Sequence, residues 1–332
     1  MNEIQQTDSV VLPIYDPMIK AYLHIGMPFS ILPSRHIESG WVYQTYAQMV
    51  YHREDPEDAF LDFENSIFWE DEDVFTKGFI AFPVKNKNDK WKMLEGLKWL
   101  IKAGYYIYAD WDEYYVPETP FYKRHFFRHY CLIYGYDKDH IYTEGYLEDG
   151  HWHRFQITQE EFVQALLEND DRDVKGVISV NTYRPRENFN KRFEWKKGKT
   201  EIQNYLYPKD EVHGRHAIRA FFDDVCSAIE RGGEFPIQSV SIAYEHKIMM
   251  LERIRFLSEE KICSKEIADQ YELIKKGFYT ILCGCMKYKV TGKTAWADRI
   301  KTKTEDLLIT EKVILERMVN HGIFKKYKRL YH

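Results

Sequence analysis

The chain has 332 residues and a formal net charge of −5 at pH 7. This length predicts one large or two moderate globular domains. The acidic balance provides no basic footprint for nucleic acid, and no apolar run is long enough to span a bilayer, so neither nucleic acid nor membrane is expected as a partner. The first residues lack the basic and apolar regions of a signal peptide, and we therefore expect a cytoplasmic location.

The cysteines and histidines give no pattern typical of a metal site. Five cysteines make an odd count, which favours reduced, buried thiols over disulfides. Cys283 and Cys285 lie two residues apart in a predicted helix, so their side chains point in different directions. His125 and His129 have the spacing of a zinc-binding helix, but the proline-containing loop around them predicts no helix. We therefore expect no metal.

The N-terminal region predicts short elements. Residues 11–25 indicate a strand or turn followed by a short helical piece, which Gly26 and Pro28 interrupt. Helical spacing of apolar residues returns over residues 28–37 and 40–52.

An acidic segment and a capped helix follow. Residues 54–75 mix carboxylates with aromatic residues, and we interpret them as a solvated helix and loop rather than a carboxylate metal site. Asn88 or Asp89 can cap the next helix, whose apolar residues recur at spacings of three and four. Gly104 provides its end.

Runs of aromatic and β-branched residues, separated by turn residues, predict strands. A loop at 117–128 and a tight turn at 137–140 join the central strands into an antiparallel meander. Thr158 and Glu161 form a capping box that opens a helix. The predicted strands span residues 78–84, 105–116, 129–137, 141–147, 151–157 and 177–183.

Helical periodicity dominates the last third of the chain. Long amphipathic helices of this kind form a bundle or a cap on a sheet domain. The sequence therefore predicts an α+β domain over residues 1–210, with an antiparallel sheet packed by helices, and a helical domain over residues 211–332. The predicted long helices span residues 217–231, 239–260, 264–288 and 295–321.

One of these helices carries charges on an apolar background. Glu245 and Arg253 are two turns apart and can share a face, with Lys247 between them. Charged groups on such a face need partners if they are buried. We favour a structural ion-pair network; a rim that binds phosphopantetheine or a peptide carboxylate is the alternative.

A histidine lies where the loop at 117–128 enters a strand. The sheet would fix the backbone of His129 while its ring stays at the rim, which suits a general base. Asp112 or Glu113 from the neighbouring strand could orient the imidazole. The alternative is a buried histidine that bonds to a backbone carbonyl.

Three stretches carry a resemblance to a known family. The strand at 105–116, the run Tyr122-Lys-Arg-His-Phe before His129, and Leu132-Ile-Tyr-Gly-Tyr-Asp137 together resemble the N-terminal domain of butirosin biosynthesis protein H and its relatives, which belong with the papain-like folds of the C39 peptidase group. The helical half, around residues 244–253, is similar to the C-terminal part of such proteins. The resemblance implies a papain-like fold and an acyltransferase ancestry, in which an acyl group leaves a carrier-protein thioester and forms an amide.

The chain departs from the family pattern at two places. A papain-like transferase needs a cysteine at the start of its first core helix. Residues 22–32 contain no cysteine, and Ser30 is the nearest hydroxyl nucleophile. The orienting aspartate of the family falls at Gly145, while Glu144 is one residue away and should point to the opposite face. A covalent triad is therefore not expected.

Two functions remain open. One is a cysteine-independent acyltransferase of non-ribosomal peptide type, which condenses a carrier-bound acyl group with a small-molecule or peptide amine; His129 would be its base. The other is a catalytically inert papain-like module that binds an acyl or peptidyl carrier protein or a peptide. Neither needs a cofactor beyond phosphopantetheine on the partner. The catalytic candidates are His129, Asp112, Glu113 and Glu144, and the substrate-binding candidates are Ser30, Tyr115, His125 and Tyr134.

Overall fold

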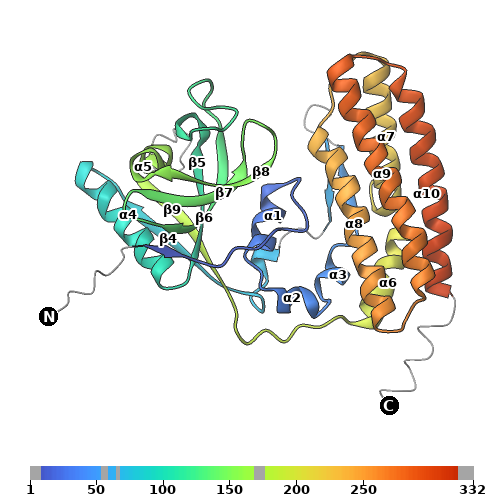
Figure 1. Ribbon diagram of the computed structural model, residues 1–332, viewed down its shortest axis with the longest axis horizontal. Coiled ribbons are helices and arrows are strands. Elements are labelled where there is room, and N and C mark those ends of the chain that lie inside the picture. Colours follow the sequence, from blue (N-terminus) through green and yellow to red (C-terminus); the bar gives the residue numbers. More distant parts are fainter. Residues whose placement is uncertain (1–8, 54–58, 65–67, 168–175, 321–332) are drawn as a thin grey trace. The chain divides into compact units, whose positions relative to one another are not determined.

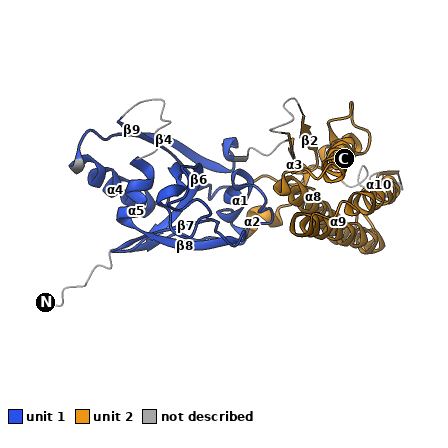
Figure 2. Cartoon of the chain, turned by 90° about the horizontal axis from the view of Figure 1, so that it is seen from above, with its two compact units in different colours: residues 1–33, 67–189 blue, residues 34–66, 190–332 orange. Residues whose placement is uncertain are grey.

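The computed structural model describes residues 9–53, 59–64, 68–167 and 176–320. It is a mixed α+β structure with two compact units (Figure 2). Unit 1 comprises Met1–Pro33 and Ile67–Phe189, and unit 2 comprises Ser34–Ser66 and Asn190–His332. This division differs from the predicted boundary at residue 210. Unit 2 contains the segment 34–66 from the N-terminal part of the chain, and its C-terminal part starts at residue 190.

Unit 1 is built on an antiparallel sheet with the strand order β4-β9-β5-β6-β7-β8, and β1 pairs with β6 (Figure 1). The predicted strands all occur, and β5 to β8 form the predicted meander. Alternating aromatic and β-branched residues favour this arrangement because they cover a pleated surface. The strands are β1 (Val10–Val11), β4 (Phe75–Pro83), β5 (Tyr106–Asp112), β6 (Arg128–Tyr136), β7 (His140–Tyr146), β8 (Trp152–Thr158) and β9 (Val177–Pro185).

Two helices pack on one face of this sheet. α4 (Lys87–Lys102) and α5 (Gln159–Leu167) share a core with residues of β5 and β6, among them Ala109 and Cys131. Asn86 caps α4 in place of the predicted Asn88 or Asp89, and its side chain accepts hydrogen bonds from the backbone N–H groups of these two residues. The capping box at the start of α5 is confirmed, since the Glu161 carboxylate accepts from the backbone and the hydroxyl of Thr158.

α1 (Leu23–Ser30) lies against the sheet and corrects the expectation of a break at Gly26 and Pro28. A side chain at Gly26 would come within 2.8 Å of the Trp152 ring, so the glycine allows the close approach of helix and strand. Pro28 costs the helix one hydrogen bond. Burial of the apolar residues around it, such as Phe29, offsets that loss.

Unit 2 pairs a hairpin with long helices. The helical expectation for residues 40–52 was wrong for its last part, because β2 (Met49–His52) pairs with β3 (Phe60–Phe63). The expectation of a helix and loop over residues 54–75 was also wrong, since β3, η1 (Phe68–Glu70) and the start of β4 occupy the described part of it. Residues 54–58 and 65–67 lie outside the described residues.

The predicted long helices are present, although the expected end of the last one, at 321, lies outside the described residues. None of the helices within the described ranges combines the length and apolar character that crossing a bilayer requires. α6 was not predicted. The helices of unit 2 are α2 (Ser34–Glu38), α3 (Val42–Thr45), α6 (Trp195–Leu206), α7 (Gly214–Glu230), α8 (Ile237–Glu259), α9 (Lys265–Thr291) and α10 (Trp296–Asn320).

Candidate functional site

The sheet of unit 1 brings a histidine and a carboxylate into contact at the end of β5. His129 of β6 pairs with Trp111 of β5. Glu113 follows Trp111 by two residues and opens the short helix η2 (Glu113–Tyr115). Residues two apart on a strand share a face, so Glu113 lies on the same side as His129. The Nδ1 atom of His129 is 2.6 Å from Oε1 of Glu113.

This pair has an asymmetric environment. The Glu113 side chain is 8% exposed, whereas the His129 side chain is 32% exposed. The contact assigns the proton of a neutral imidazole to Nδ1, which donates to the carboxylate and leaves Nε2 as an acceptor. A fixed tautomer with one unused acceptor is the arrangement that general base catalysis needs.

Asp112 does not orient the imidazole. Its Oδ1 accepts hydrogen bonds from the backbone N–H groups of Tyr114 and Phe127, so it fixes the turn that carries Glu113. The backbone N–H of Glu113 also donates to the Phe127 carbonyl, at 2.9 Å. The expectation of a catalytic role for Asp112 is therefore replaced by a structural one.

Aromatic rings flank His129 on one side. The Phe127 ring lies edge-on to the imidazole with a centroid distance of 5.3 Å, and Phe121 stacks on Phe127. These rings leave about a third of the imidazole exposed. The alternative of a buried histidine bonded to a backbone carbonyl does not fit, because the Nδ1 partner is the carboxylate of Glu113.

Glu144 belongs to a different place in unit 1. It pairs with Leu132, three residues along β6 from His129, so strand alternation puts it on the opposite face of the sheet. This confirms the expected orientation and removes Glu144 from the His129 site. Burial raises the pKa of its carboxyl to about 7, against the opposing effects of the Ser30 hydroxyl and the Trp152 indole.

The four substrate-binding candidates do not form one site. Ser30 is completely buried and donates to the Met27 carbonyl, and Tyr134 is 7% exposed, so neither fits the expected contact with a substrate. His125 is exposed in the loop before β6. Tyr115 lines a cavity of about 630 Å³ in unit 1. Only His125 and Tyr115 are placed where a ligand could reach them.

Unit 1 contains no available thiol. Cys131 is its single cysteine in the sequence, and it is fully buried in the sheet core. Burial raises the pKa of this thiol well above its ordinary value. Since the thiolate is the nucleophilic form of cysteine, Cys131 is not suited to nucleophilic catalysis.

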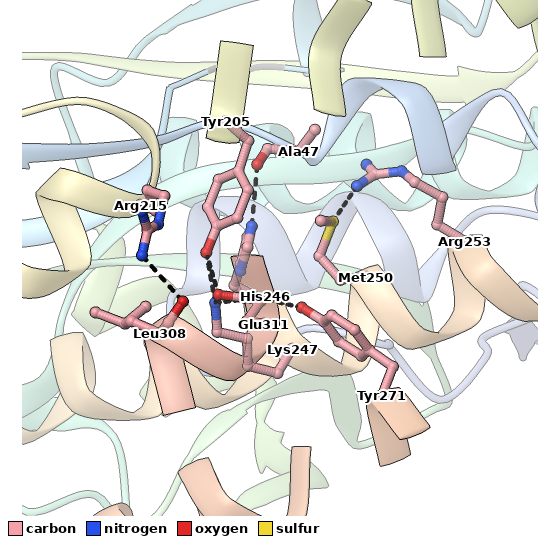
Figure 3. Close-up of polar contacts among 10 residues, drawn as sticks. All are labelled: Ala47, Tyr205, Arg215, His246, Lys247, Met250, Arg253, Tyr271, Leu308 and Glu311. Carbon is pink, nitrogen blue, oxygen red and sulfur yellow. Dashed lines mark hydrogen bonds and ion pairs between the residues drawn. The ribbon is translucent and has the colours of Figure 1, made fainter. Parts of the chain in front are cut away.

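Unit 2 contains a buried polar network (Figure 3). The Lys247 ammonium on α8 donates to Glu311 of α10 at 2.8 Å and to the Tyr205 hydroxyl at 2.7 Å. The Tyr271 hydroxyl donates to the same carboxylate. Burial lowers the pKa of Lys247, and the charge of Glu311 opposes this effect.

The network has the character of a structural ion pair, because Lys247 is completely buried and Glu311 is 1% exposed. Arg253 is also buried and donates to the Tyr43 carbonyl. Sequence reasoning named Lys247 and missed its partner. The available signal was a glutamate on the apolar face of α10, beside Leu308 and Leu315.

No group of three or more metal-ligating side chains occurs in the described part of the chain. No protein-family model and no curated protein matches this sequence.

Proposed function

We propose that the chain is an amide-forming acyltransferase of non-ribosomal peptide type, which acts on a carrier-protein thioester and an amine without a cysteine nucleophile. The contact between Nδ1 of His129 and the nearly buried Glu113 carboxylate carries this proposal. The resemblance of residues 105–137 supplies the substrate class. The papain-like arrangement of unit 1 rests on that resemblance alone, since Glu144, which contacts Ser30 of α1, lies on the opposite face of the sheet from His129.

The chemistry needs one base. A thioester is already activated, so the amine nitrogen attacks its carbonyl carbon while Nε2 of His129 takes the amine proton. The tetrahedral intermediate collapses with cleavage of the carbon–sulfur bond, and the leaving thiolate takes the proton back from the imidazolium. Glu113 stabilises the imidazolium between these steps. The products are an amide and the free thiol of the carrier.

The alternative is an inert module that binds a carrier protein or peptide. The lack of a nucleophile on α1 favours it, together with the complete burial of Ser30 and Cys131. Both proposed functions have an acyl or peptidyl carrier protein as the partner and would be carried out in the cytoplasm. They differ in whether thioester cleavage depends on His129.

A model reaction tests the proposal. We expect the full chain to accelerate thiol release from acyl N-acetylcysteamine thioesters in the presence of amines. His129→Ala should lower the rate by about 100-fold or more, which is the usual contribution of a general base. Glu113→Gln should lower it less, because the base remains but loses its orienting charge. His151→Ala is the matched control, since His151 is an exposed histidine in the turn before β8, and it should leave the rate unchanged.

Equal rates for the wild type, the His129→Ala variant and the buffer would reject the transferase. If an acylated carrier protein nevertheless binds the chain, the inert module becomes the better account.

A further inference from the structure

Unit 2 holds a cavity of about 820 Å³ between its hairpin and α7. Small-molecule sites typically have volumes of about 300–1,000 Å³. Its wall has an apolar part, with Phe60 from β3 and Phe221 from α7, and Phe235 just before α8. Phe60 is 37% exposed, so its ring is accessible to a ligand.

The polar part of the wall is fixed by hydrogen bonds. Tyr51 of β2 is 4% exposed, and its hydroxyl donates to the Asp224 carboxylate at 2.8 Å. Arg53 pairs with the same carboxylate at 2.9 Å. Burial and the hydrogen bond to Asp224 raise the pKa of Tyr51, so its hydroxyl remains a neutral donor at physiological pH. Strand and helix are therefore held together at the cavity.

The charges on the wall do not cancel locally. Asp224 pairs with Arg53, and Glu234 pairs with Lys289 at 2.6 Å. Arg231, which follows the last residue of α7, also lines the cavity, and its guanidinium has no ion-pair or hydrogen-bond partner among residues 9–53, 59–64, 68–167 and 176–320. The positive charge of the Arg231 guanidinium is therefore unpaired on a cavity wall that also contains aromatic rings.

We propose that this cavity binds a small organic monoanion, a carboxylate attached to an aromatic or branched aliphatic body. The carboxylate lies on Arg231 and the outer edge of Arg53, because a planar guanidinium matches its two oxygens. The body packs against Phe60 and Phe235. A second negative charge is disfavoured by the carboxylate of Asp224. This binding function does not depend on the proposed acyl transfer.

Calorimetric titration of the full chain tests the inference. The probes are benzoate and 3-phenylpropionate, with benzamide as the neutral counterpart and phenyl phosphate as the dianion. We expect the two carboxylates to bind more tightly than benzamide and phenyl phosphate. Arg231→Gln should weaken carboxylate binding by about 10-fold or more, the effect of losing one charge-assisted hydrogen bond. Arg219→Gln, which removes an exposed arginine of α7 that does not line the cavity, should not change it.

The thermal midpoint of each variant is measured alongside, so that a loss of binding is not confused with a loss of folding. Three results would overturn the inference: no binding of either carboxylate, equal binding of benzamide, or an affinity that Arg231→Gln leaves unchanged in a folded protein. Tighter, Arg231-dependent binding of phenyl phosphate would replace the carboxylate by a phosphate ester as the ligand.

Discussion

Glu144 makes the stability of unit 1 depend on pH in a direction that the structure fixes. Its side chain is completely buried, and burial raises its pKa from 4.5 to about 7. A carboxyl whose folded-state pKa is raised binds more protons in the folded state, so its contribution to stability is present below pH 4.5 and is lost as the pH rises through 7. We expect the ionisation of Glu144 to lower the free energy of unfolding of the wild type by about 2–3 kcal/mol between pH 5 and pH 8.

Glu144→Gln removes the titration and keeps the shape of the side chain. At pH 5 the free energies of unfolding of the two proteins should differ by about 1 kcal/mol or less. Between pH 5 and pH 8 the free energy of unfolding of the variant should rise by about 2–3 kcal/mol relative to that of the wild type. Hydrogen exchange of peptides from β7, read by mass spectrometry, measures this difference, because intrinsic exchange rates cancel when both proteins are compared at the same pH. If the stability difference between the two proteins stays the same from pH 5 to pH 8, the conclusion that Glu144 is buried and titrates in this range is wrong.

Three further substitutions test the packing. Glu311→Leu leaves the Lys247 charge buried without its partner and should cost about 3–5 kcal/mol in urea unfolding followed by far-ultraviolet circular dichroism; addition of Lys247→Met should recover part of the loss, and strictly additive effects would contradict the pairing. Gly26→Ala forces a methyl group against Trp152 and should lower stability by about 1–3 kcal/mol, seen as a lower thermal midpoint; an unchanged midpoint would contradict the close approach. Asp112→Ala should expose residues 117–127 to limited proteolysis, because two backbone N–H groups lose their acceptor, and an unchanged digestion pattern would exclude this role.

Local patterns predicted most of the sheet of unit 1 and the long helices of unit 2. The capping box of Thr158 and Glu161 acts within one turn, and strand alternation acts between neighbouring residues, so the sequence contains the whole signal. The same holds for Glu144, whose orientation follows from its position relative to His129 on adjacent strands.

The errors arose where distant contacts decide the structure. Gly26 and Pro28 look like helix breakers, but the helix continues because Trp152 of β8 packs onto the glycine. Residues 49–52 have an apolar pattern that fits either a helix or a strand, and pairing with β3 selects the strand. The division of the chain at 34–66 also depends on such contacts and has no local signal.

The candidate site was predicted in part for the same reason. The contact between His129 and Glu113 could be predicted because they lie on two adjacent, paired strands. The different roles of Asp112 and Glu113 could not, because they depend on η2, where Asp112 accepts a hydrogen bond from the backbone N–H of Tyr114. Glu311 is 64 residues from Lys247, and only the packing of the helices brings them together.

The most direct test of the account is intact-mass spectrometry of an acyl-loaded carrier protein, incubated with candidate amines and either the wild type or its His129→Ala variant. The account predicts that the wild type unloads the carrier and forms the amide, and that the variant does neither above the rate without protein. Unloading by the variant at the wild-type rate, or no unloading by a wild type that binds the loaded carrier, would contradict His129 as the base of an acyltransferase.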